Sequence, residues 1–253
     1  MMKGVNRRAF RRSFFLETLW NYEKMQNLGF SFCIYPALER LYPDQNDRKG
    51  AVSRHLEAVN THPSMGPLLA GLTARLEHDL EQTTVIPYRK RVMSALAAHG
   101  DRIFWTHVKP LAAVWASLVS FCFFGSALGC VILLVLYNVP QLVMRAGGFR
   151  WGWKDGLRVL QAFKSPRMEA AMLVMRGTTA LGLGLLAGAV VLASSRSYGA
   201  ALAQLTLATC LPVLTGIALL LLLRRVSLTA VIYLTALAAV TLFVVLHGGT
   251  SVE

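Results

Sequence analysis

Long apolar runs in the second half of the chain constrain its fold more than any other feature. They cover residues 111–139, 177–193, 199–223 and 226–246. A helix of about 20 residues crosses the roughly 30 Å of bilayer hydrocarbon, so each run is near the length of a span. Because backbone polar groups must be satisfied within the bilayer, such runs predict helices. We therefore expect an all-α membrane protein with about three to four transmembrane helices.

Composition and charge agree with this class. Charged residues make up 15% of the chain, against about 25% in ordinary soluble domains. The net charge of +13 fits either nucleic-acid binding or positive charge at the cytoplasmic face of a bilayer. The apolar runs favour the bilayer, so we expect no nucleic-acid partner. Most acidic residues precede residue 111, which predicts a polar, amphipathic helical region at 1–110, cytoplasmic or interfacial, and a membrane domain at 111–253.

The distribution of Lys and Arg predicts the orientation of the spans. The segment 145–176 is strongly basic and should be a cytoplasmic loop, which puts the carboxyl terminus outside. Residues 1–110 are basic too, so both flanks of 111–139 look cytoplasmic. A re-entrant helical element between 85 and 140, broken near Gly125–Ser126 and Gly129, would satisfy both flanks. Two alternatives remain. The long polar region does not follow the positive-inside rule, or another segment that enters the membrane precedes Asp101.

Three amphipathic helices are expected in the amino-terminal region. The first is a basic helix with an aromatic stripe, which suits an anionic bilayer surface or a clasp on another subunit; a soluble-domain helix packed on its own core is the alternative. Asp47 could cap a second helix through about Asn60. A third helix over about 65–82 has a leucine stripe, with Glu77 and Glu81 on its polar side. The stripe of the first helix consists of Phe10, Phe14, Phe15, Leu19 and Tyr22.

Four polar residues are candidates for binding a sugar-like ligand. Asn60, Thr61 and His62 meet at a helix end, where free backbone groups also offer hydrogen bonds. They could equally just satisfy that helix terminus. Asp101 is the acid nearest to the first apolar run, where a carboxylate is costly unless it is paired or functional. An ordinary helix cap at the interface is the alternative for Asp101.

A second group could form a contact with another subunit. Trp20, Glu23, Gln26 and Asn27 lie within a few residues of one another. They could form a polar site or an inter-subunit contact. Anchoring of the aromatic side chains at the membrane interface is the competing interpretation.

Motifs for catalysis, metals or cofactors are not found. The six histidines form no HExxH pattern, and the four cysteines form no CxxC pair and should be small buried hydrophobes. There is no P-loop, GxSxG or GxGxxG motif. We therefore expect no catalytic residue, no metal site and no cofactor.

Several ordered motifs resemble one known family. They are Trp20–Phe30, Arg54–Glu57, Asn60–Pro63, Gly100–Trp105 and Tyr137–Val139, followed by the stretch around Gly152. Together they resemble the IID membrane subunit of the mannose/fructose/sorbose family of bacterial sugar phosphotransferase systems. The resemblance covers most of the chain, and its specificity is concentrated in residues 10–110.

The resemblance implies a function that composition alone does not indicate. It implies a non-catalytic subunit of a phosphoenolpyruvate-dependent sugar phosphotransferase in the bacterial cytoplasmic membrane. Its implied partners are a IIC membrane subunit, soluble IIA and IIB phosphocarriers and a hexose-type sugar, with IIC–IID pairs assembling as a trimer.

One segment departs from the family pattern. Residues 85–99, where the family has a Gly-rich apolar hairpin, here contain Arg89-Lys90-Arg91. Such a segment could lie along the membrane surface but would not dip easily into hydrocarbon. The alternative function is therefore a IID-derived protein that anchors or regulates phosphotransferase components without supporting transport.

Overall fold

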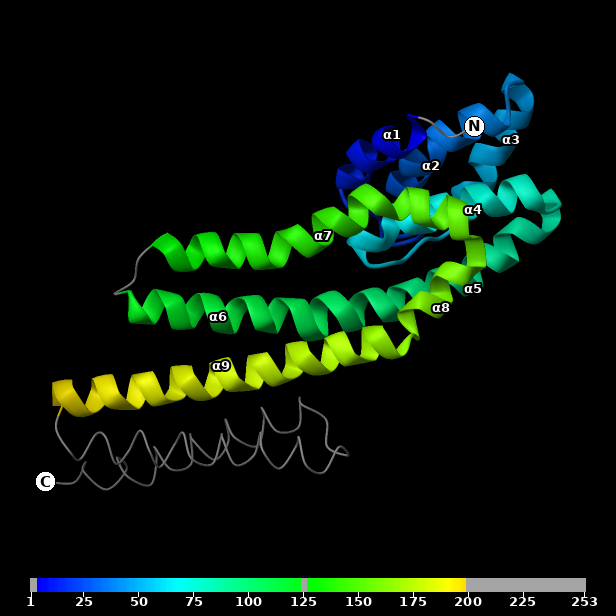
Figure 1. The fold of residues 1–253 in the computed structure, drawn as a ribbon. Helices are drawn as coiled ribbons and strands as arrows, with labels where there is room; N and C mark the ends of the chain where they lie inside the picture. The colour runs from blue at the N-terminus through cyan, green and yellow to red at the C-terminus, as the bar shows by residue number, and fades with distance from the viewer. Residues whose placement is uncertain (1–3, 124–126, 199–253) are drawn as a thin grey trace, which may run out of the picture. The chain divides into compact units, whose positions relative to one another are not determined.

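The computed structural model describes residues 4–123 and 127–198, and these are almost entirely helical (Figure 1). The first seven elements are α1 (Val5–Arg12), η1 (Ser13–Phe15), α2 (Asn27–Leu41), α3 (Gln45–His55), η2 (Pro63–Met65), α4 (Gly66–Asp79) and α5 (Gln82–Gly100). The remainder are η3 (Asp101–Val108), α6 (Lys109–Cys122), α7 (Ala127–Asp155), η4 (Gly156–Arg158), α8 (Val159–Phe163) and α9 (Pro166–Tyr198). The described part contains no strand, which confirms the all-α class.

Two stretches of the described chain are long and apolar enough to cross a membrane, Ala127–Phe163 and Pro166–Val190. The predicted spans 199–223 and 226–246, and the carboxyl-terminal tail, lie outside the described residues. The segment 145–176 is largely helical, because α7 continues to Asp155 and α9 begins at Pro166.

The apolar run 111–139 is not one span. Helix α6 ends at Cys122, and α7 begins at Ala127 and runs back along it (Figure 1). Gly129 on α7 lies against Ala116 and Ser120 of α6, so close that a Cβ at position 129 would be 2.6 Å from the Ser120 Cβ. The chain therefore forms a helical hairpin at this position, as the charge on both flanks predicted.

By contacts the chain divides into two units. One contains Met1–Ala113 and Ile132–Arg176, and the other contains Val114–Val131 and the residues from Gly177 onward. The division into 1–110 and 111–253 stays a prediction. In the second unit, Gly182 of α9 packs on Val114 and Trp115. A Cβ added at Gly177 or Gly188 would have no neighbour within 4 Å among the residues that the structure describes.

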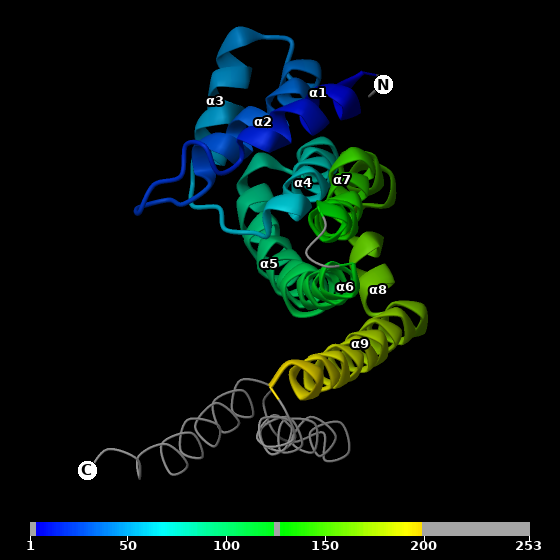
Figure 2. The same cartoon turned by 90° about the vertical axis from the view of Figure 1, so that its left-hand side faces the viewer.

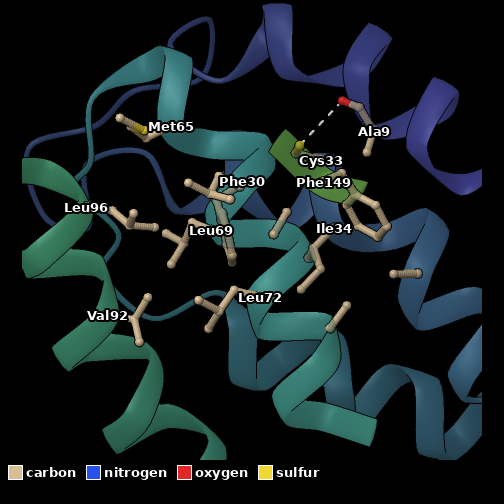
Figure 3. Packing of buried hydrophobic residues seen from close by; sticks show 14 of the residues in the cluster. Ala9, Phe30, Cys33, Ile34, Met65, Leu69, Leu72, Val92, Leu96 and Phe149 are labelled. Carbon is tan, nitrogen blue, oxygen red and sulfur yellow. Dashed lines mark hydrogen bonds between the residues drawn. The ribbon is translucent and has the colours of Figure 1, made fainter. Parts of the chain in front are cut away.

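The core of the first unit lies among α2, α4 and α5 (Figure 3). Phe30, Leu69, Leu72 and Leu96 are fully buried there. Cys33 also lies in this core, and its thiol donates to the Ala9 carbonyl at 3.5 Å. Burial raises the pKa of this thiol to about 12, so it is an inert thiol, as expected. The prediction of burial was wrong for Cys122 and Cys130, which are exposed on α6 and α7.

Glycines allow α4 and α7 to approach at backbone distance. A Cβ on Gly71 would lie 2.1 Å from the carbonyl oxygen of Phe149, and one on Gly152 would lie 2.4 Å from that of Leu68. Gly148 and Gly152 are four residues apart, so they present one small-residue face of α7 to α4. The sequence stretch around Gly152 is thus a packing surface for α4.

Three details of the amino-terminal helices differ from the sequence prediction. Helix α1 ends at Arg12, so the predicted aromatic stripe continues through η1 and an irregular loop instead of one helix. The cap of α3 is Asp44, whose carboxylate accepts from Asn46 N–H at 2.7 Å, so the expected Asp47 cap was wrong. Helix α3 ends at His55, not near Asn60.

Side chains of α2 explain this early end. Ser31 donates to the His55 carbonyl at 2.8 Å, and Asn27 donates to the Leu56 carbonyl at 2.9 Å. These bonds satisfy carbonyls that a longer α3 would have used.

Candidate functional site

The candidate substrate residues gather at a polar junction, defined as the loop from Asn60 to Ser64 and the start of the η3 helix. This helix has π geometry, and α5, η3 and α6 follow one another without a gap from Gln82 to Cys122. His107 and Thr106 each bond a carbonyl five residues earlier, at 2.6 and 3.5 Å. π-Turns are rare and are frequent at functional sites.

His62 is the centre of the junction. Its ring stacks on Phe104 with centroids 4.7 Å apart, and the Trp105 ring meets it edge-on at 6.1 Å. Gly100 permits this, because a Cβ there would lie 2.4 Å from the His62 Cβ. The structure thus joins two motifs that are some 40 residues apart in the sequence.

Hydrogen bonding and burial keep His62 neutral. Its Nδ1 accepts from the Ser64 N–H at 3.2 Å, so the ring proton is on Nε2. Burial lowers the pKa of His62 to about 4, although the charge of Asp101 acts in the opposite direction. The Ser64 hydroxyl in turn donates to Gln141 of α7 at 2.9 Å. His62 is therefore a neutral, packed ring at neutral pH.

Gln26 fixes the neighbouring residue. Its amide donates to the Thr61 carbonyl at 2.7 Å and accepts from the Thr61 N–H at 2.9 Å. The same amide nitrogen donates to Glu17 at 2.6 Å. The loop and the start of α2 are thus joined through one side chain, a role that the sequence alone did not indicate.

Asn27, like Gln26, makes its hydrogen bonds within the protein. Besides bonding the Leu56 carbonyl, its side-chain oxygen accepts from Asn21 at 2.9 Å. Gln26 and Asn27 are both buried, whereas Trp20 and Glu23 are exposed in the loop before α2. Of the four residues expected at a subunit contact, two therefore hold the loop in place and two have free surface.

The solvent-facing polar groups of the junction are Asn60 and Asp101, both exposed. Trp105, four residues after Asp101, is half exposed, and Lys109 Nζ lies 4.2 Å from the centroid of its ring. The Asn60 N–H contacts the Met93 sulfur of α5 at 3.3 Å. An exposed carboxylate and a half-exposed indole on one helix are groups that can bind a polyol by hydrogen bonds and stacking.

A second polar cluster lies deeper in the same unit, and the sequence did not predict it. Glu77 was expected on the polar side of α4, but its side chain is fully buried. Its carboxylate accepts from His55 Nε2 at 2.8 Å, from Arg54 at 3.0 Å and from the Tyr42 hydroxyl. Burial raises the pKa of Glu77, but these hydrogen bonds outweigh burial and lower it to about 2. Glu77 is therefore a buried carboxylate anion.

Arg89 completes this cluster from α5. It is fully buried, lies over the Phe30 ring at 5.6 Å and donates to His55 Nδ1 at 3.1 Å. His55 is therefore neutral, with its proton on the Nε2 that faces Glu77. The expectation that residues 85–99 lie along the membrane surface does not hold for Arg89, because its side chain is fully buried. The charges of Glu57 and Glu77 partly offset the cost of burying this guanidinium.

The exposed basic residues of the same segment have other neighbours. Lys90 pairs with Glu57 at 2.8 Å, and Arg91 lies 6.0 Å from the Tyr88 ring. Lys90 and Arg91 therefore remain on the surface, where a partner could reach them.

A cavity of about 520 Å³ lies elsewhere in this unit, among α4, α5 and η4. Leu72, Leu76 and Leu157 form part of its wall, with Lys154 and Arg158 beside them. None of the candidate substrate residues lines it. Among the described residues no group of three or more His, Cys, Asp or Glu side chains could hold a metal ion.

The two buried imidazoles predict an acid-sensitive fold. Burial lowers the pKa of both His55 and His62 from 6.5, so the unfolded chain binds these protons more tightly. The free energy of unfolding should therefore fall as the pH drops from about 6.5 towards 4, by about 3 kcal/mol for His62 alone. Apparent melting temperatures of the detergent-solubilised protein between about pH 7.5 and 5 test this. His62→Gln should flatten the profile, and an unchanged slope in that variant would contradict the assignment.

Comparison with known proteins gives a consistent match. The profile of the "PTS system mannose/fructose/sorbose family IID component" matches residues 2–248. The mannose-specific EIID component of Escherichia coli (strain K12) is 35% identical over 162 residues, which cover 61% of this chain and 56% of that protein. The fructose permease IID component of Bacillus subtilis (strain 168) is 32% identical over 181 residues, covering 69% and 64%.

A solved structure matches as well. It is the cryo-electron microscopy structure of the mannose transporter ManYZ in complex with microcin E492, with a TM-score of 0.57 and 31% identity over 76% of this chain and 70% of that one. The chain spans 56–64% of the length of the curated relatives above.

Proposed function

The chain belongs to the mannose/fructose/sorbose family of phosphotransferase-system IID components, and from that membership we propose that it is the IID membrane subunit of a sugar transporter. It pairs with a IIC subunit to form a translocation complex for a hexose-type sugar. Phosphorylation of the sugar is carried out by soluble IIA and IIB components, so this chain itself is non-catalytic. The IIC–IID pairs form a trimer in the bacterial cytoplasmic membrane, with the carboxyl terminus of this chain outside.

The observation that carries this proposal is the family match over residues 2–248. The apolar helices α7 and α9 support it, since a translocation subunit must span the bilayer. The polar junction supports it as well, because Asp101 and Trp105 offer a carboxylate and an aromatic face on the same helix.

Vesicle uptake tests the proposal. Membrane vesicles that contain this chain and its cognate IIC, supplied with IIA, IIB and a phosphoryl donor that phosphorylates IIA, should take up and phosphorylate a sugar. Vesicles that lack this chain should not. A panel of hexoses identifies the substrate. The proposal fails if a stable complex with IIC gives the same uptake with and without this chain.

Within the junction we assign separate roles to the candidate residues. Asn60 and Asp101 contact the sugar, because their side chains are exposed. Thr61 and His62 are buried. The backbone of Thr61 is held by Gln26, and the ring of His62 packs on Phe104. Gln26 and Asn27 are positioning residues that act through this loop.

Asp101→Asn is expected to weaken sugar binding without affecting the fold. Replacing a carboxylate that accepts sugar hydroxyls should raise the KM for uptake about tenfold, since hydrogen bonds to charged groups contribute about 1.5–3 kcal/mol. The exposed Asp47→Asn on α3 is the matched control. A KM equal to that of the wild type would exclude Asp101 from the sugar site.

The altered segment 85–99 favours a second candidate function, in which the protein anchors or regulates phosphotransferase components without moving sugar. The structure sharpens the test, because Lys90 and Arg91 are exposed whereas Arg89 belongs to the buried cluster. The variant Lys90→Gln/Arg91→Gln removes surface charge and leaves Arg89 in place. Loss of uptake in a folded complex would assign this segment to transport. Absent wild-type uptake with retained binding of IIB would favour anchoring.

A further inference from the structure

An apolar surface with no covering residues in the described chain lies at the amino-terminal end of the first unit. Seven large side chains that are between 41% and 93% exposed form this aromatic surface: Phe14, Phe15, Leu19, Trp20, Tyr22, Leu28 and Phe32. Figure 2 shows the segment between η1 and α2 projecting from the side of the α1–α5 bundle. Apolar patches of this size on a folded unit mark an interaction surface.

Two pairs of rings within this surface contact each other. Phe15 and Phe32 meet edge-on with centroids 6.0 Å apart, and Trp20 and Tyr22 do so at 4.9 Å. The bridges from Met25 to Asn21 and Val59 close the projecting loop. The aromatic surface is therefore preformed and does not require ordering by a partner.

Contacts with α7 give the depth of this surface relative to the bilayer. Residues 127–144 of α7 carry no charge, and at 1.5 Å per residue they span about 27 Å, close to the thickness of the hydrocarbon. Arg145 is the first charged residue after them. Its guanidinium donates to the Ser13 carbonyl at 2.6 Å and lies 5.3 Å from the Phe14 ring. Phe14 is therefore at the level where the apolar part of α7 ends.

The Asn6 side chain also holds α1 at this position along α7. The Asn6 side chain donates to the Ala146 carbonyl at 3.0 Å and accepts from the Arg150 N–H at 3.2 Å. Because it bridges successive turns of α7, α1 is locked to the helix at one height. Arg7 and Arg11 of α1 are exposed, and among the described residues neither has an ion-pair partner. The helix that carries these two basic side chains therefore lies at the level of residues 146–150 of α7, just beyond the uncharged part of that helix.

We propose that the aromatic surface lies in the headgroup region of the cytoplasmic leaflet and binds anionic phospholipid. The rings of Trp20 and Tyr22 enter the interface, which is where such amphipathic rings are enriched in membrane proteins. Arg7 and Arg11 pair with lipid phosphates, as juxtamembrane basic residues do on the negatively charged leaflet. The surface anchors the first unit at a constant height and does not itself require sugar transport.

Depth-dependent fluorescence quenching tests this. The full chain, together with its IIC partner, is reconstituted in vesicles of phosphatidylcholine and phosphatidylglycerol that carry a nitroxide either at the headgroup or deep in the acyl chain. The difference between wild type and Trp20→Phe isolates the emission of Trp20. The headgroup nitroxide should quench it at least about twice as strongly as the deep nitroxide, as expected for a tryptophan at the interface.

Two results would overturn the proposal. Quenching of Trp20 by aqueous iodide but by neither nitroxide would place the loop in water. Shielding from iodide and both nitroxides would show that a protein subunit covers the surface. Quenching is independent of uptake, so it distinguishes failure of this proposal from failure of the transport function.

The basic residues give a second readout. Arg7→Gln/Arg11→Gln should remove most of the dependence of Trp20 quenching on the phosphatidylglycerol content, because the phosphate partners are lost. Lys49→Gln on the exposed face of α3 is the control and should keep that dependence. An unchanged dependence in the double variant would refute the lipid assignment.

Discussion

Replacing Gly71 by alanine is expected to prevent this chain from folding. The new Cβ would lie 2.1 Å from the carbonyl oxygen of Phe149 and 2.7 Å from its carbonyl carbon, and both are backbone atoms of α7. No rotamer change relieves such a clash, so α4 and α7 must separate. Overpacking of side chains typically costs 1–3 kcal/mol, and a backbone clash should cost at least about 3 kcal/mol. Since Arg145 and Asn6 join α7 to α1, the loss would extend to the aromatic surface.

The measurement is the yield of monodisperse protein in mild detergent and its apparent melting temperature. Gly152→Ala should behave like Gly71→Ala, because its Cβ would lie 2.4 Å from the Leu68 carbonyl oxygen. Gly50→Ala is the matched control, since its nearest neighbour is a side-chain atom at 3.9 Å. The control should gain about 1 kcal/mol from helix propensity. A folded Gly71→Ala protein with the melting temperature of wild type would refute the close approach of α4 and α7.

Glu77→Gln is expected to destabilise the first unit almost as strongly. The substitution keeps the shape but removes the negative charge that pairs with Arg54 and that, together with Glu57, compensates Arg89. Breaking a buried ion pair from one side costs about 3–5 kcal/mol, because the other charge is left without compensation. The amide would also be unable to accept from His55, Arg54 and Tyr42 at once.

The test compares this variant with Asp79→Asn on the same helix. Asp79 pairs with Arg75, but both side chains are exposed, so its loss should cost less than about 1 kcal/mol. Thermal unfolding in detergent at neutral pH measures both. Acidification gives an independent check: the folded pKa of Glu77 is about 2, below the usual 4.5, so its contribution is lost as the pH falls below about 4.5. Equal melting temperatures for the two variants would show that Glu77 is not a buried anion.

Much of the candidate site could be anticipated from the sequence. The ordered motifs indicated Asn60–Pro63 and Gly100–Trp105 as parts of one family pattern, and the structure brings His62 of the first into contact with Phe104 and Trp105 of the second. The separate roles within these motifs could not be anticipated. From the sequence, Thr61 and His62 are as good candidates for contact with a ligand as Asn60. Their burial depends on contacts with Gln26 and Gly100, which are too far away in the sequence for a local pattern to predict.

The sequence by itself determined the membrane class and the family, and it favoured the helical hairpin over the alternatives. These follow from the length of apolar runs, the sign of the flanking charge and the order of motifs, all of which are local or additive along the chain. Only the tertiary structure decided that Glu77 and Arg89 are inside and that Phe14 and Trp20 are outside. A helical period shows that one face differs from the other, but which face is covered depends on what packs against it. The contacts of α4 with α7 and of Glu77 with His55 decide which faces are buried. These contacts form only when segments that are distant in the sequence come together.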